Sequence, residues 1–108
     1  MKPHAFQILL ALSEGELHAT GIVRRVREQT DGAVELWPVT LHRTLDKLHD
    51  DGLIADLGPG EHPAGESRRR RFYRLTDDGA GALADEAERL SSLASVARRN
   101  LGKERWRP

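Results

Sequence analysis

Cysteine is absent from this chain of 108 residues, and several other features that would narrow its function are scarce. Without thiols there is no disulfide framework, no cysteine-bound iron–sulfur centre and no thiol catalysis. The longest apolar run, residues 8–12, is far too short to span a bilayer, and the sequence shows no signal peptide. The cytosol is therefore the expected compartment.

Net charge gives no sign of a nucleic-acid partner, because 17 Lys and Arg balance 17 Asp and Glu. Any basic footprint must therefore be local. The positive surplus falls in residues 53–75, where every cation is an arginine. A length of 108 residues fits one domain with an appended helix.

Motifs for catalysis are missing as well. The sequence has no GxSxG, no HExxH and no phosphate-binding glycine loop, so we do not expect an enzyme. His42, Asp46 and His49 share one side of a predicted helix, but their imidazoles would lie two turns, or about 10 Å, apart. One tetrahedral zinc does not readily take both, so we predict no metal and no cofactor, with a metal-responsive regulator kept as an alternative.

Hydrophobic periodicity predicts three helices before residue 53. Residues 4–13 are apolar on almost every face, which indicates a buried helix, and a second helix is expected from Thr20, a possible N-cap. The third begins near Pro38, ends at Gly52 and repeats leucine at i, i+4 and i+7. Beside its leucines lies a polar stripe without acidic residues: Thr40, Arg43, Thr44 and Lys47.

A basic hairpin is expected next. Residues 53–57 and 71–75 read as strands around a loop rich in Gly and Pro, which ends in Arg68, Arg69 and Arg70. The polar stripe of the third helix and the arginine run of the loop would each, taken alone, fit an ordinary solvated surface. Together they are expected to bind DNA, with base contacts from the helix in the major groove and wing contacts from the loop to phosphate or the minor groove. A protein-interaction module with an acidic partner is the alternative.

The C-terminal residues 77–102 predict one long helix with a heptad pattern, followed by a tail at 103–108. A sustained 3.5-residue period favours pairing with a second long helix, and packing on the same chain is the alternative. The expected dimerisation residues are Leu83, Ala87, Leu90, Ala94, Ala97 and Leu101.

Three segments carry a family resemblance: Val39 to Leu48, Asp51-Gly52-Leu53-Ile54, and Arg70 to Gly79. With residues 17–22, they are similar to the PadR family of bacterial winged-helix transcriptional regulators, over residues 4 to about 100. The resemblance implies a class that is mainly α with a small β-hairpin: a winged helix-turn-helix at 1–76 and a dimerisation helix at 77–102. It also implies a homodimer on double-stranded DNA with a pseudo-palindromic operator, acting as a repressor relieved by a small hydrophobic or aromatic effector.

The sequence differs from the family pattern at the start of the third helix. Gly-Thr-Leu-Tyr is usual there, whereas this chain has Val39-Thr40-Leu41-His42. His42 occupies the position of that tyrosine, where the resemblance implies a contact with DNA. It could make binding depend on pH because imidazole titrates near neutrality. Trp37 and Trp106 are the large aromatics on which a planar effector could stack, although Trp37 also fits a core position.

Overall fold

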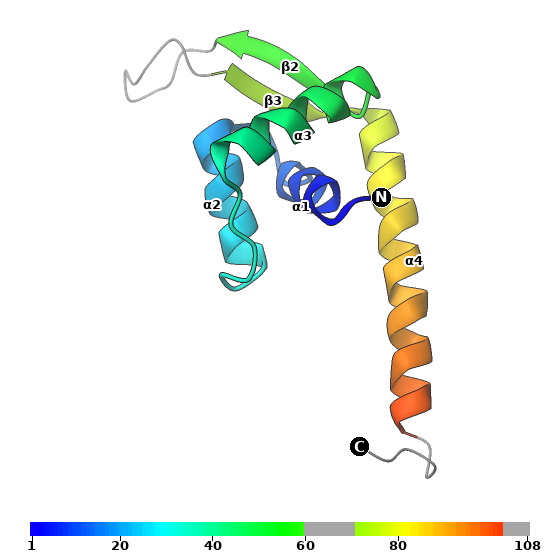
Figure 1. Ribbon diagram of the computed structural model, residues 1–108. Helices are drawn as coiled ribbons and strands as arrows, with labels where there is room; N and C mark the ends of the chain where they lie inside the picture. Colours follow the sequence, from blue (N-terminus) through cyan, green and yellow to red (C-terminus); the bar gives the residue numbers. More distant parts are fainter. Residues whose placement is uncertain (60–70, 103–108) are drawn as a thin grey trace.

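The computed structural model describes residues 1–59 and 71–102. Three helices, α1 (Pro3–Leu12), α2 (Ala19–Gln29) and α3 (Pro38–Asp50), pack with a small antiparallel sheet, and α4 (Asp77–Leu101) projects from this body (Figure 1). The predicted class, a mainly α winged helix followed by one long helix, is confirmed. Among the described residues, no helix has the length and apolarity needed to cross a membrane.

The sheet has one strand more than the expected hairpin. Its order is β1 (Leu17–His18), β3 (Arg71–Leu75), β2 (Ile54–Pro59), with Leu17 opposite Tyr73 and His18 opposite Phe72. Two residues are too few to show the alternation by which a strand is found in a sequence. Because β1 leads directly into α2, this pairing ties the helix-turn-helix to the wing.

The core lies where the three helices of the body meet. The leucines expected to face inward from α3, Leu41, Leu45 and Leu48, are all buried, as the periodicity predicted. Ile8 and Leu9 of α1 and Ile22 and Val26 of α2 are fully buried with them. The inward face of α3 is thus fixed, and the opposite face must point away from the body.

The start of α2 differs from the prediction. The N-cap is His18, whose Nδ1 accepts a hydrogen bond from the Gly21 amide at 2.9 Å, and Thr20 lies inside the helix. Histidine is not among the usual capping residues, so the sequence pattern pointed to the nearby threonine instead. The N-cap of α4 is Thr76, whose hydroxyl accepts a hydrogen bond from the Gly79 amide at 3.0 Å.

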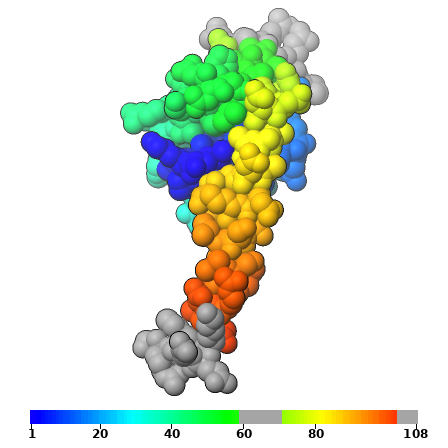
Figure 2. Space-filling view, turned by 90° about the vertical axis from the view of Figure 1, so that its right-hand side faces the viewer, coloured from blue at the N-terminus to red at the C-terminus, as the bar shows by residue number. Residues whose placement is uncertain are grey.

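One apolar stripe of α4 has two different surroundings. In its first turns Gly79 is buried and Leu83 packs against the core of its own chain, so the intramolecular alternative holds for Leu83. From Leu90 onward the stripe is exposed except for the half-buried Ala94, and Figure 2 shows the orange-to-red end of α4 projecting away from the body. Between the two parts lies Glu86, which is buried and accepts two hydrogen bonds from Arg89, both at 2.7 Å.

Candidate nucleic-acid interface

The outward face of α3 carries the exposed members of the predicted stripe. Arg43 and Lys47 are exposed, as is His42 on the neighbouring side, whereas Thr40 and Thr44 are half-buried next to the leucine face. A helix turns about 100° per residue, which places Arg43 nearly opposite Leu41 and Leu45. Both cations therefore lie on the solvent-facing surface of α3, and the two threonines lie at the edge of the same surface.

Polar contacts within α3 limit what each side chain can offer. The Thr44 hydroxyl donates to the Thr40 carbonyl at 2.7 Å, so towards a ligand it can act only as an acceptor. The Lys47 ammonium lies 3.2 Å from the Asp51 carboxylate. Within the part of the chain that the structure describes, the Arg43 guanidinium has no hydrogen bond or ion pair. Arg43 is thus the stripe's most available charge.

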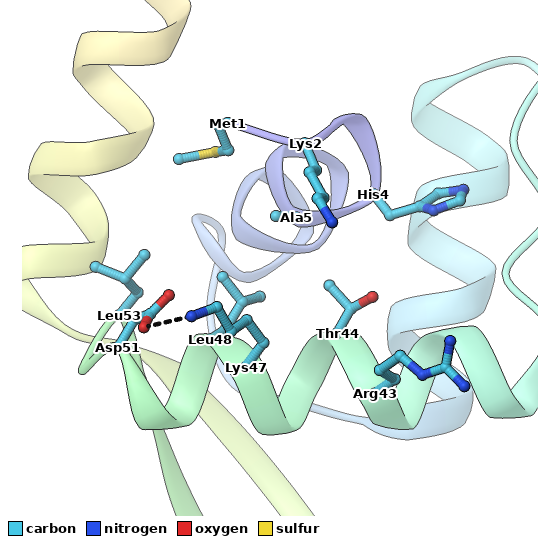
Figure 3. Close-up of a pocket in the computed structure, with 10 residues that line it drawn as sticks. All are labelled: Met1, Lys2, His4, Ala5, Arg43, Thr44, Lys47, Leu48, Asp51 and Leu53. Atoms are coloured by element: carbon cyan, nitrogen blue, oxygen red, sulfur yellow. Dashed lines mark hydrogen bonds and ion pairs between the residues drawn. The ribbon is translucent and has the colours of Figure 1, made fainter.

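A groove separates the stripe from the start of α1. Figure 3 shows Arg43, Thr44 and Lys47 on α3 below Lys2 and His4 on the N-terminal segment. The groove has a volume of about 640 Å³, and its apolar lining comes from Met1, Ala5, Leu48 and Leu53. Lys2 and His4 were not predicted at the site. They are separated from α3 by more than thirty positions in the sequence, and only the packing of α1 beside α3 brings them to the stripe.

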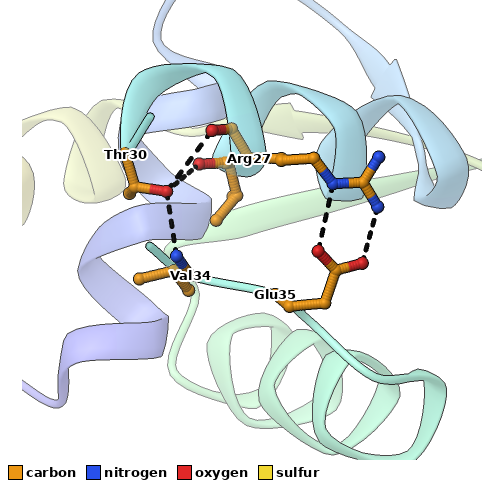
Figure 4. A network of polar contacts seen from close by, with 5 residues as sticks. Arg27, Thr30, Val34 and Glu35 are labelled. Carbon is orange, nitrogen blue, oxygen red and sulfur yellow. Dashed lines mark hydrogen bonds and ion pairs between the residues drawn. The ribbon is translucent and has the colours of Figure 1, made fainter. Parts of the chain in front are cut away.

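The connection between α2 and α3 is held by a network of polar contacts (Figure 4). The Arg27 Nε donates to the Glu35 carboxylate at 3.0 Å, and the Thr30 hydroxyl donates to the Val26 carbonyl while accepting from the Val34 amide. The hydrogen bond from Arg27 lowers the pKa of Glu35, and the carboxylate in turn raises the pKa of Arg27. The network fixes where α3 begins relative to α2.

The wing is described only in part. Arg71 begins β3 and lies 3.1 Å from the Asp56 carboxylate on β2, as expected for an arginine that flanks the strand. Gly58, with a φ of 73°, follows a bulge in β2 and donates its amide to the same Asp56 side chain. The predicted wing contacts, Arg68, Arg69 and Arg70, lie outside the described residues.

The metal alternative gains no geometric support. His42, Asp46 and His49 are all exposed on α3. Across residues 1–59 and 71–102, no group of three or more His, Cys, Asp or Glu side chains is arranged to hold an ion.

The sequence profile of the transcriptional regulator PadR-like family matches residues 8–85. The chain belongs to this family. A curated relative, transcriptional regulator Rv3488 of Mycobacterium tuberculosis, is 30% identical over 87 residues, which are 81% of this chain and 75% of the relative. Members are transcriptional regulators rather than enzymes, in agreement with the missing catalytic motifs.

Solved structures agree on the fold. Bacillus subtilis PadR in complex with operator DNA aligns with a TM-score of 0.67 at 25% identity, over 81% of this chain and 46% of that one. A PadR-like transcriptional regulator from Bacillus cereus aligns with a TM-score of 0.78 over 94% of this chain and 93% of that one. At 17% identity the second likeness concerns the fold alone.

Proposed function

We propose that this PadR-family chain is a homodimeric, sequence-specific DNA-binding repressor that is relieved by a small hydrophobic or aromatic effector. The observation that carries the proposal is the exposed Arg43 on the outward face of α3, opposite the buried leucines. The relative solved with operator DNA supports the choice of duplex DNA over an acidic protein partner.

In this proposal α3 enters the major groove. Arg43 donates two hydrogen bonds to a guanine edge, which is the commonest specific contact of an arginine there. Thr44 accepts from a base amino group, since its own proton is committed to the Thr40 carbonyl. Thr40 and Lys47 also lie in the major groove, His42 faces the DNA beside them, and Arg68, Arg69 and Arg70 provide wing contacts to phosphate or the minor groove.

Dimerisation is assigned to residues 77–102 and DNA reading to residues 1–76. Leu90 and Leu101 are 39% and 55% exposed, and Ala87 and Ala97 are exposed beside them on the same stripe of α4. Ala94, which is half-buried, belongs to the same stripe, while Leu83 is partly buried against the core of its own chain. Leu93, which is 52% exposed, lies next to this stripe and widens it. An exposed apolar stripe about 16 Å long supports a second copy as its cover.

A two-fold dimer presents two copies of α3. The operator is then a pseudo-palindrome whose half-sites lie about 34 Å apart, one turn of the duplex, or a multiple of it. The groove between α1 and α3 supports effector relief, because Ala5, Leu48 and Leu53 give it an apolar floor and Arg43 lies at its edge. A ligand bound there would compete with DNA for the same arginine.

The test measures the affinity of the full chain for labelled DNA duplexes, by fluorescence anisotropy at a series of salt concentrations. Labelled duplexes come from the region upstream of the chain's own gene, with a scrambled duplex of equal length as the competitor. Replacing Arg43 by Ala should weaken operator binding by about 1–3 kcal/mol and relax base preference at one position. Arg99→Ala is the matched control, because Arg99 is exposed near the far end of α4.

Equal affinity for operator and scrambled duplex would instead favour the protein-interaction alternative. Adding candidate aromatic or hydrophobic ligands to the same titration tests relief: a true effector lowers operator affinity in proportion to its occupancy. A change in melting temperature on adding zinc would revive the metal-responsive alternative at His42, Asp46 and His49.

A further inference from the structure

Two large apolar side chains stand at the start of α3 without a role in the fold. Trp37 and Val39 are each 69% exposed, the highest values among the large apolar residues of the described chain. Trp37 is the N-cap residue of α3 and Val39 follows Pro38 in its first turn. Trp37 is therefore not the core residue that its size allowed, and the structure leaves both side chains largely in water, where a partner that covered them would gain from their burial.

Val39 belongs to the same outward face as Arg43. The two are four residues apart, so their Cβ atoms are neighbours on the helix surface, about 5–6 Å from each other. The leucines of α3 occupy the opposite side. Any partner that Arg43 reaches from this face also meets the isopropyl group of Val39.

The acidic residues of α3 show which end of this face can approach DNA most closely. Asp46, Asp50 and Asp51 all lie in the second half of the helix or at its C-cap, whereas residues 38–44 contain no acidic side chain. DNA phosphates are repelled by these three carboxylates and attracted by the positive end of the helix dipole at residues 38–40. The N-terminal turn, with Trp37 and Val39, is then the part that enters the groove most deeply.

We propose that Val39, flanked by Trp37, reads thymine through its C5-methyl group. This methyl is the one apolar group that base pairs display in the major groove, so it is the chemical match for an exposed isopropyl group beside an arginine. The inference rests on the proposed DNA-binding function.

The experiment replaces single thymine methyl groups. An operator is first selected from a random duplex library with the full chain, and each thymine is then exchanged for deoxyuridine, which lacks only the methyl. Wild type should lose about four-fold in affinity at one or two thymines of each half-site, as expected for one buried methyl group. In Val39→Ala the same exchanges should cost clearly less, because alanine keeps only one methyl group for the contact. Val96→Ala, the same change at an exposed position of α4, should keep the wild-type pattern.

Two results would overturn the inference while leaving the proposed function intact. One is a selected operator at which no deoxyuridine exchange matters. The other is an equal penalty at the same thymines in wild type and Val39→Ala. If the library yields no preferred duplex at all, the proposed function fails and the inference fails with it. Val39→Ala should fold normally, because the side chain is exposed and alanine favours a helix.

Discussion

Gly79 offers the sharpest test of how α4 is joined to the winged helix. It lies in the first turn of α4, is buried, and donates its amide to the Thr76 hydroxyl. A methyl group added to Gly79 would lie 1.9 Å from the Leu53 carbonyl oxygen and 2.8 Å from the Leu75 Cδ1. Ordinary van der Waals contact begins near 3.4 Å, so the helix or the Leu53 backbone must move by more than an ångström.

Moving that backbone has an identifiable cost. The Leu53 carbonyl accepts a hydrogen bond from the Thr76 amide at 3.1 Å, and losing it removes about 1 kcal/mol. Overpacking adds about 1–3 kcal/mol, while exchanging Gly for Ala in a helix returns up to about 1 kcal/mol. Gly79→Ala should therefore lower the free energy of unfolding by about 1–3 kcal/mol.

Gly81 provides a matched control two residues further along the same helix. A methyl group there would have no heavy atom within 4 Å, so Gly81→Ala keeps only the gain in helix propensity. It should raise the free energy of unfolding by up to about 1 kcal/mol. Urea denaturation followed by far-UV circular dichroism measures both variants. The reasoning would be refuted if Gly79→Ala were as stable as wild type, or if both variants shifted in the same direction.

Two further predictions concern assembly and acid stability. Leu90→Asp should shift the sedimentation coefficient towards that of the monomer, whereas Ser92→Asp, on the opposite side of α4, should leave it unchanged. A dimer retained in both variants would contradict dimerisation through the apolar stripe of α4. Hydrogen bonds from Arg89 hold the pKa of Glu86 below its ordinary 4.5, so its stabilising effect is present above that pH and lost as pH falls through the lowered value. The difference in melting temperature between wild type and Glu86→Gln should therefore shrink on acidification, and a constant difference would argue against it.

Elements with a strong local signal were predicted closely. The leucine period placed α3, and Asp51-Gly52 placed its end. These features depend on contacts between residues three or four apart, which the sequence displays directly. The N-cap of α2 was placed wrongly at Thr20, because the His18 imidazole takes that role.

Features that depend on distant segments could not be predicted. The strand β1 has only two residues and exists because β3 lies beside it. Lys2 and His4 join the candidate site only because α1 packs next to α3, and Glu86 is buried although its sequence neighbours are exposed. No short-range pattern encodes such contacts, since their partners are many residues away.

The sequence by itself determined the family, the kinds of elements and the polar stripe of α3, because each is carried by local spacing of residue types. Only the tertiary structure decided which of those residues face solvent. It packed Leu83 against the core of its own chain and left Leu90, Leu101, Trp37 and Val39 exposed. Exposure depends on which surfaces the other elements cover, and that is a property of the packed chain as a whole.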